Sequence, residues 1–171
     1  AKVYNETREK QDAYFSEMLG KDDNGAMRAI TRDYVFTKPF QADETNRKID
    51  TESALGFRVA NARNDAGLLA AVAKARQAFD GAHDCLSHGD LHAGSVMVDG
   101  ARTVCIDAEF ACRGPAGLDI AFLIAGYVFA FCAADAHAAD AEAAGIRRVS
   151  CGDAIKALWR AYSDARQGEP K

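Results

Sequence analysis

The stretch HGDLHAGSVMVDGARTVCIDAEF, residues 88 to 110, decides the fold because it joins two β-rich runs to a cluster of acidic side chains. The runs Ser95–Val98 and Thr103–Asp107 flank an Asp-Gly pair, which is a strong signal for a β-hairpin. The stretch also holds two histidines, three aspartates, one glutamate and three glycines. We therefore expect a small hairpin with chemically active side chains at its open end.

The open end of this hairpin is expected to gather several acidic side chains. Asp90 precedes the first strand, while Asp107 and Glu109 lie at and just beyond the end of the second. A hairpin brings the start of one strand beside the end of its partner. We expect Asp90, Ser95, Asp107 and Glu109 to converge within one small volume. Carboxylates that lie so close raise one another's pKa unless a cation neutralises them.

Oxygen ligands of this kind favour a hard divalent cation, Mg²⁺ or Mn²⁺. With the later carboxylates on the metal, Asp90 is free to act as a base or to orient a hydroxyl. Phosphoryl transfer needs this arrangement, because the metal bridges phosphate oxygens while a separate carboxylate aligns the attacking hydroxyl. The protein-kinase pattern places Asn five residues after the catalytic Asp. Here that position is Ser95, a weaker oxygen ligand, and Asp107 falls at the later metal position.

Around the hairpin the sequence predicts an α+β fold that is mainly helical. Helical patterns cover Asn5–Leu19, Ala26–Arg32, Thr51–Phe79, Ile120–Ala134 and Asp153–Arg166. Val35–Asp50 contains Pro39 and many polar residues and is expected to be mostly loop. Asp135–Gly145 is expected to be loop or weak helix.

The most apolar run, Ile120–Ala134, is predicted to be a buried helix rather than a membrane span. Its 15 residues (IAFLIAGYVFAFCAA) fall short of the roughly 18 to 20 apolar residues that a span requires. We expect its aromatic residues to lie in the core, namely Phe122, Tyr127, Phe129 and Phe131. No membrane association is therefore expected.

The composition is that of one folded domain with a core, since 49% of the 171 residues are hydrophobic and 27% are charged. The net charge of −4, without a block of Lys or Arg, argues against nucleic-acid binding. The charged beginning, AKVYNETREK, lacks the apolar segment of a signal peptide.

The five cysteines, at positions 85, 105, 112, 132 and 151, are odd in number and include no Cys-x-x-Cys pair. This spacing suggests neither a zinc ribbon nor a disulfide framework. Most are expected to be small buried hydrophobic residues. A reducing compartment, the cytoplasm, is therefore expected.

Three segments together resemble a known enzyme family: ITRDYVFTKPF (30–40), LSHGDLHAGSVMV (86–98) and VCIDAEFACRGPAGLDIAFLIA (104–125). They are similar to the catalytic lobe of the 5-methylthioribose kinases, in the aminoglycoside-phosphotransferase and choline-kinase-like branch of the kinase superfamily. The branch shares His-Gly-Asp and a downstream Asp. Ser in place of Asn in HGDLHxGS, and Asp-x-Glu in place of Asp-Phe-Gly, point to the narrower family. The resemblance covers about residues 30 to 165 and is strongest from 86 to 130.

The resemblance implies a role for each of these residues. Asp90 would be the catalytic base, acting on the 1-hydroxyl of methylthioribose, a reaction of methionine salvage. Asp107 and Glu109 would hold Mg²⁺ against the phosphates of ATP. Asp119 would brace the catalytic loop by hydrogen bonds. The implied cofactors are ATP and Mg²⁺, the partner is a small-molecule substrate whose binding residues stay unassigned, and a homodimer is possible.

Two departures from the family pattern stand out. The family has Asp-Pro-Glu where this chain has Ala108, and proline would stiffen that turn by fixing φ. No Gly-rich phosphate loop precedes residue 88, and the family continues beyond the helix that contains Trp159. We therefore expect residues 1–171 to be a single, incomplete kinase-like catalytic lobe without its N-terminal ATP-binding lobe and its C-terminal end. Such a chain is expected to transfer phosphate poorly or not at all.

Three other functions stay open at this point. One is another aminoglycoside- or choline-type phosphotransferase, and a second is a non-catalytic binding protein. The third is a metal-dependent hydrolase built on His88, Asp90, His92 and Asp107. The two histidines lie four residues apart, as in zinc-binding helices, but Gly89 disfavours a helix there. We expect His88 to be structural, with a hydrogen bond to the backbone near the catalytic loop, and Asp119 also suits a helix cap.

Overall fold

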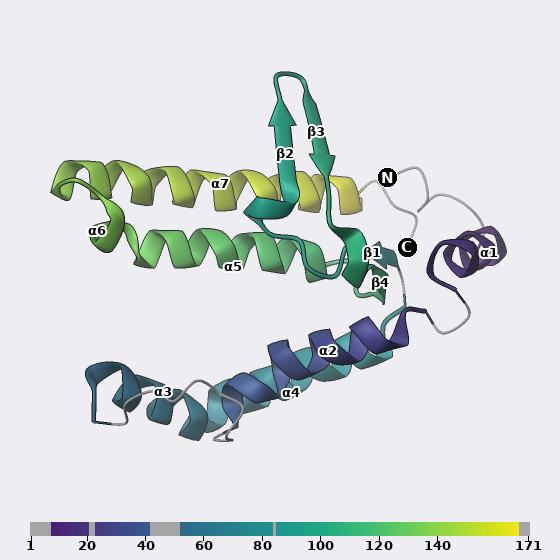
Figure 1. The fold of residues 1–171 in the computed structure, drawn as a ribbon, viewed down its shortest axis with the longest axis horizontal. Helices are drawn as coiled ribbons and strands as arrows, with labels where there is room; N and C mark the ends of the chain where they lie inside the picture. The colour runs from purple at the N-terminus through teal and green to yellow at the C-terminus, as the bar shows by residue number, and fades with distance from the viewer. Residues whose placement is uncertain (1–7, 21–22, 42–51, 84, 168–171) are drawn as a thin grey trace.

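The computed structural model describes residues 8–20, 23–41, 52–83 and 85–167, which form two pairs of packed helices around two small β-sheets (Figure 1). One pair is α2 (Gly25–Phe36) and α4 (Ala66–Gly81), and the other is α5 (Leu118–Cys132) and α7 (Ala141–Gln167). The remaining helices are α1 (Arg8–Leu19), α3 (Ala54–Asn64) and the short α6 (Ala134–His137). The expectation of a mainly helical α+β fold is confirmed.

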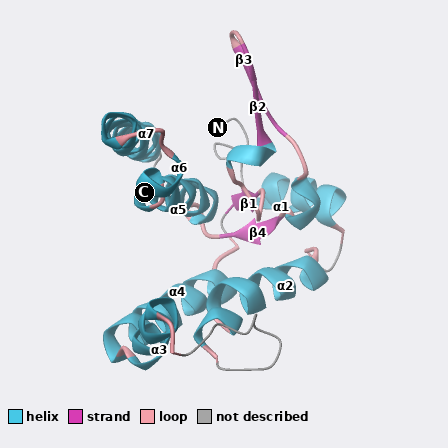
Figure 2. Cartoon of the chain, turned by 60° about the vertical axis from the view of Figure 1, so that its left-hand side comes forward, coloured by secondary structure: helices cyan, strands magenta, loops and turns pink. Residues whose placement is uncertain are grey.

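The sheets are two antiparallel pairs, of which only the β1–β4 pair lies between the helical pairs (Figure 2). Strand β1 (Cys85–Ser87) pairs with β4 (Cys112–Gly114), and Ser87 lies opposite Cys112. Strand β2 (Val96–Asp99) pairs with β3 (Arg102–Cys105) in the predicted hairpin. In the sequence, β1 precedes the hairpin and β4 follows it. Because β1 and β4 pair, the segments before and after the hairpin lie close together.

The β2–β3 hairpin turns at Gly100 and Ala101 and projects from the helical body (Figure 1). Asp99 and Arg102 are the last paired residues, so the turn has two residues. Gly100 has φ of 55°, which glycine adopts without the steric cost of a side chain. A glycine with positive φ at the first turn position fits the right-handed twist of the strands.

The long helix expected over Thr51–Phe79 is two helices in the structure, α3 and α4. Ser53 caps α3, since its hydroxyl accepts a hydrogen bond from the backbone N–H of Gly56 at 3.0 Å. Asp65 ends α3 in an extended conformation and caps α4, accepting from the N–H of Leu68 at 2.9 Å. An aspartate that satisfies a free N–H favours a new helix start over continuation. The expected start at Thr51 lies outside the described residues, as does Asn5 in the first helix.

Two other helices are longer than the sequence suggested. Helix α2 continues to Phe36, so the expected loop begins only after it, with Pro39 in a 3₁₀ turn at Lys38–Phe40. Residues 42–50 of that loop lie outside the described part. Helix α7 begins at Ala141 instead of Asp153 because Asp140 accepts a hydrogen bond from the N–H of Ala143 at 2.8 Å. This cap converts part of the expected weak segment into helix.

The burial expected for the apolar helix is wrong for its C-terminal half. Leu118 is buried, and Phe122 and Tyr127 are partly buried. Phe129 is 72% exposed, and Phe131 is also exposed. The physical reason is that α5 packs chiefly against one helix, α7, which leaves its other side open. Among the described helices, none combines the length and apolar character needed to cross a bilayer.

The cysteines differ in burial, although all five are free thiols. Cys112 and Cys151 are buried and Cys85 is partly buried, whereas Cys105 and Cys132 are exposed. The expectation of buried cysteines is therefore wrong for those last two. Burial raises the pKa of the Cys112 thiol, against the opposing influence of nearby Arg28.

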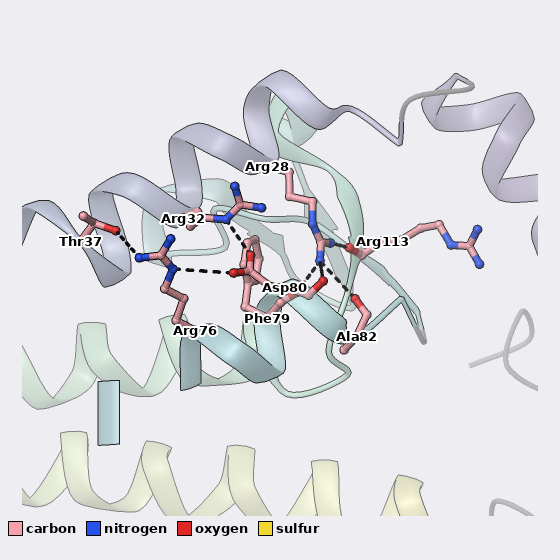
Figure 3. A network of polar contacts seen from close by, with 8 residues as sticks. All are labelled: Arg28, Arg32, Thr37, Arg76, Phe79, Asp80, Ala82 and Arg113. Carbon is pink, nitrogen blue, oxygen red and sulfur yellow. Dashed lines mark hydrogen bonds and ion pairs between the residues drawn. The ribbon is translucent and has the colours of Figure 1, made fainter. Parts of the chain in front are cut away.

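A buried arginine joins α2 to α4 and β4 (Figure 3). Arg28 is only 6% exposed, and its guanidinium donates to the carbonyl oxygens of Asp80 and Ala82 at 3.3 Å each. It also donates to the carbonyl oxygens of Phe79 and Arg113, and lies 4.6 Å from the centre of the Phe79 ring. Several of these carbonyls belong to the end of α4, where helices leave acceptors unsatisfied. Arg28 therefore fixes α2 against the elements on either side of the hairpin.

Candidate active site

Two segments of the chain meet between the β1–β4 and β2–β3 pairs. The loop 88–95 leaves β1 and enters β2, and the segment 106–111 leaves β3 and enters β4. Because β1 pairs with β4 and β2 with β3, both segments run between the same two ladders. The first segment carries Asp90, and the second carries Asp107 and Glu109.

Direct hydrogen bonds hold these two segments together. The carbonyl of Ser95 accepts from the N–H of Ile106 at 2.9 Å. The Nε2 of His88 lies 2.7 Å from the carbonyl oxygen of Ile106. A carbonyl can only accept, so this nitrogen carries a proton. The Ser95 side chain is buried, and its hydroxyl donates to the carbonyl of Asp90 at 3.3 Å. Asp90 thus lies in a loop tied at both ends to the residue before Asp107.

Asp119, in the first turn of α5, binds the beginning of the same loop. Its Oδ2 accepts from the N–H of His88 at 2.8 Å, and its Oδ1 accepts from the N–H of Gly89 at 3.1 Å. A carboxylate with two backbone donors makes charge-assisted hydrogen bonds, which are about twice as strong as neutral ones. Asp119 therefore restrains the backbone immediately before Asp90. The catalytic role of that loop stays a prediction.

Replacing Asp119 by Ala should release the beginning of the loop. Hydrogen bonds to a charged group contribute about 1.5–3 kcal/mol each, and about 1.4 kcal/mol corresponds to a factor of ten. Hydrogen exchange at the amides of His88 and Gly89 should therefore become at least about tenfold faster. Asp153→Ala, which removes an exposed carboxylate on α7, is the matched control. Unchanged exchange at both amides in Asp119→Ala would show that Asp119 does not hold the loop.

The backbone at Gly89 approaches the second segment too closely for any side chain. Gly89 is buried and has φ of +84°, in the left-handed region. A Cβ at this position would lie 2.1 Å from the carbonyl oxygen of Phe110. The glycine thus allows the residue before Asp90 to contact the residue after Glu109. No other residue type fits without moving the backbone.

Gly89→Ala should destabilise the chain more than Gly100→Ala. Both glycines have positive φ, so both variants lose about 1–2 kcal/mol from the backbone conformation. Only Gly89 has an atom in the way, because nothing lies within 4 Å of a Cβ built on Gly100. Overpacking should add about 1–3 kcal/mol at Gly89. Urea unfolding of both variants measures the difference, and equal losses would refute the close contact.

The carboxylates of the second segment remain open to solvent. Asp107 has φ of 61°, which is uncommon outside glycine, and it begins the 3₁₀ turn Ala108–Phe110. Strained residues of this kind gather at functional sites. Among the described residues, the carboxylates of Asp107 and Glu109 form no hydrogen bond or ion pair, and both residues are exposed. They are available to a ligand from outside the chain.

The carboxylates of Asp107 and Glu109 suit a metal ion that is also bound by phosphate oxygens. Within the described residues, no three or more His, Cys, Asp or Glu side chains are placed to hold a metal ion. The two backbone segments that carry Asp90, Asp107 and Glu109 therefore come together as expected. Their carboxylates do not form a closed metal site made of protein ligands alone. Mg²⁺ does not need such a closed site, because it is usually bound by one or two carboxylates together with substrate phosphates and waters. Asp107 and Glu109 fit that mode, and their metal role stays a prediction.

The histidines are already used in local structure. His88 is bonded to the backbone through Nε2, as described above. The Nδ1 of His92 accepts from the N–H of Gly94 at 3.0 Å and caps the 3₁₀ turn Ala93–Ser95. One nitrogen of each ring thus serves the loop backbone, which is a structural use rather than a zinc-binding one.

Residues before α2 also position the site, and the sequence alone did not reveal this. The Nδ2 of Asn24 donates to the carbonyls of Glu109 and Ala111 at 2.9 Å each. Asp23 Oδ1 accepts from the N–H of Arg113 at 3.2 Å. Asn directly before a helix is a typical helix start. That signal locates the helix, but not its contacts with a segment some 85 residues away.

A cavity of about 520 Å³ lies beside Asp90. Helix α2 provides one wall, and the loop, the second segment and α5 provide the others. The lining residues are Ile30, Thr31, Tyr34, Val35, Gly89, Asp90, Phe110 and Phe122. Ligand pockets typically measure about 300–1,000 Å³ and combine apolar walls with a few polar groups. The cavity therefore has the size and lining of a small-molecule site.

Comparisons with known proteins identify the family to which the chain belongs. Residues 20–162 match the model of the phosphotransferase enzyme family. The methylthioribose kinase of Citrobacter koseri is 35% identical over 144 residues, covering 84% of this chain and 35% of that protein. The methylthioribose kinase of Pectobacterium atrosepticum is 37% identical over 134 residues, covering 78% and 32%. That of Yersinia enterocolitica is 34% identical over 134 residues, covering 78% and 33%.

The chain thus spans about a third of the length of the curated relatives that it matches. The matched residues include α2, both β-pairs, the loop with Asp90 and helix α5. The resemblance seen in the sequence is confirmed, and the chain belongs to the phosphotransferase enzyme family.

Proposed function

We propose that the protein carrying this chain transfers the γ-phosphate of ATP to a hydroxyl group of a small molecule. The observation that carries the proposal is the joining of two segments, in which the loop with Asp90 is hydrogen-bonded to the strand end that leads into Asp107. Phosphoryl transfer depends mainly on placing a hydroxyl beside a metal-bound phosphate. The kinase names of the relatives support the same reaction.

In this proposal Asp90 accepts the proton of the attacking hydroxyl, and Asp119 keeps the loop in position by its two hydrogen bonds. Asp107 and Glu109 hold Mg²⁺, which neutralises charge on the phosphate oxygens when it is bound. Ser95 is buried with its hydroxyl on the Asp90 carbonyl, so its main part is to shape the loop. Direct binding of the metal by Ser95 is the weaker prediction.

The specific acceptor in this proposal is 5-methylthioribose, phosphorylated at its 1-hydroxyl in methionine salvage. Support comes from the printed names of the relatives and from the HGDLHAGS and Asp-Ala-Glu sequences around the site. We further propose that residues 1–171 correspond to part of a kinase-like catalytic lobe, because the chain matches only 35% of the length of the Citrobacter koseri relative. A cytoplasmic location accords with the five free thiols.

The test is an acceptor screen with the natural protein that contains this chain. It is incubated with ATP, Mg²⁺ and one of methylthioribose, choline or an aminoglycoside, and phosphorus NMR identifies the product. We expect a sugar 1-phosphate from methylthioribose and little product from the others. Transfer to choline or to the aminoglycoside instead would contradict the acceptor. Absence of transfer to all three would contradict the proposed reaction.

The hydrolase alternative makes a different prediction. It requires metal bound by His88 and His92, whose rings already serve the backbone. Tightly held stoichiometric zinc, retained after dialysis, would favour the hydrolase. Weak Mg²⁺ binding that strengthens when nucleotide is added would favour the kinase.

A further inference from the structure

The cavity beside Asp90 has one charged group in an otherwise mostly apolar lining. Asp90 is the single charged side chain in the lining that the structure describes. Ile30 and Val35 of α2 and the rings of Phe110 and Phe122 make most of the rest apolar. A ligand that fits must therefore bring one polar group to Asp90 and apolar surface to the other walls.

This lining does not suit the phosphates of a nucleotide. Phosphate groups require Arg, Lys, a metal ion or a run of backbone donors. The described lining contains neither Lys nor Arg, and the carboxylate of Asp90 repels anions. An alcohol suits it, because a hydroxyl donates to a carboxylate while an attached apolar group contacts the walls. The described lining therefore favours an alcohol over the phosphates of a nucleotide.

Helix α2 contributes half of the lining residues from one face. Ile30 and Tyr34 are four residues apart, as are Thr31 and Val35, so the four side chains lie together on the helix surface. The part of the helix that precedes these four residues is fixed, by Asn24 on the segment 109–111 and by Arg28 on α4 and β4. A binding wall held in this way can discriminate between ligands of different size.

We propose that α2 forms the specificity wall of the acceptor site, with Ile30 and Tyr34 limiting the size of an apolar substituent on the alcohol. The inference rests on the proposed function, in which Asp90 meets the acceptor hydroxyl. It assigns the substrate class as a small alcohol that carries a compact apolar group. The thiomethyl group of methylthioribose is such a substituent.

The experiment measures binding of three alcohols to the natural protein that contains this chain by calorimetry: methylthioribose, ribose and the S-butyl analogue of methylthioribose. Ribose lacks the apolar group, so we expect it to bind about tenfold more weakly than methylthioribose. Ile30→Phe fills the cavity and should weaken methylthioribose about tenfold, with a smaller effect on ribose. Tyr34→Ala opens it and should move the preference towards the S-butyl analogue.

Both substitutions are at positions that tolerate change, since Ile30 is 39% and Tyr34 is 62% exposed. Phe57→Ala is the matched control, because Phe57 is a 63% exposed aromatic residue on α3 outside the lining. Equal affinities for ribose and methylthioribose, or wild-type affinities in both α2 variants, would overturn the inference. Absence of binding of all three alcohols would overturn it as well.

A transfer assay on the natural protein separates this inference from the proposed function. Binding that depends on Ile30 and Tyr34, without any phosphate transfer, would contradict the proposed function and leave α2 as the wall of an alcohol-binding site. Transfer to methylthioribose with an unchanged KM in Ile30→Phe and Tyr34→Ala would keep the function and remove the wall.

Discussion

Replacing Asp90 by Asn should lower the rate of phosphate transfer in the natural protein by about 10²–10⁴-fold, the usual contribution of a general base. Asn keeps the size of the side chain but accepts no proton from the attacking hydroxyl. The structure predicts that the loss falls on kcat rather than on folding. Asp90 is exposed, and the loop is held by its backbone and by neighbouring side chains.

The measurement is steady-state kinetics with methylthioribose as the varied substrate. Asp99→Asn is the matched control, because Asp99 is an exposed aspartate at the far end of β2. We expect its kcat to stay within about twofold of wild type, as surface substitutions usually have small effects. A kcat for Asp90→Asn equal to that of Asp99→Asn would dismiss Asp90 as the base.

Arg28→Met should lower the free energy of unfolding by about 3–6 kcal/mol. Methionine keeps most of the apolar stem that packs on Phe79 but donates nothing to the four carbonyls that Arg28 binds. Each lost hydrogen bond to a charged donor costs about 1.5–3 kcal/mol, and part of that is recovered where water reaches the carbonyls. The decrease in the free energy of unfolding should therefore be several times larger than that caused by an ordinary surface substitution.

Arg32→Met is the matched control, since Arg32 lies one turn further along the same helix (Figure 3). Its guanidinium pairs with Asp80 at 2.6 Å, but both side chains are partly exposed. A partly exposed pair contributes about 0–1 kcal/mol. Arg28→Lys should lie between the two, because an ammonium keeps the charge without the planar fork. Urea unfolding of the variants tests the ranking, and equal losses in Arg28→Met and Arg32→Met would refute it.

The hairpin and the mainly helical fold follow from local signals. The Asp-Gly pair between two β-rich runs specifies the hairpin, and apolar periodicity locates the helices. The break between α3 and α4 at Asp65 could also have been predicted from the sequence. An aspartate before Ala-Gly-Leu can cap the start of a helix as well as lie inside one. The Ala-rich sequence on both sides of Asp65 hides the break between the two helices. Alanine favours helix throughout, so its pattern does not show where one helix ends and the next begins.

The parts that sequence reasoning missed depend on long-range contacts. Arg28 and Asn24 look like ordinary residues of a helix and its start, yet they bind segments more than 50 residues away. The proposed acceptor wall on α2 could not be predicted from the sequence for the same reason, because neither Ile30 nor Tyr34 belongs to a catalytic pattern. Exposure of Phe129 was unforeseen because hydrophobicity predicts burial only where another element is present to cover the residue.

The central claim is that Asp90 meets the acceptor hydroxyl while Asp107 and Glu109 hold the metal on the nucleotide. The most direct measurement is a crystal structure of the natural protein with Mg²⁺, a non-hydrolysable ATP analogue and methylthioribose. The account predicts an Asp107 oxygen at roughly 2.0–2.1 Å from the metal, and an Asp90 oxygen at roughly 2.6–3.2 Å from the 1-hydroxyl. Magnesium held by other side chains, with Asp90 turned away from the sugar, would contradict it.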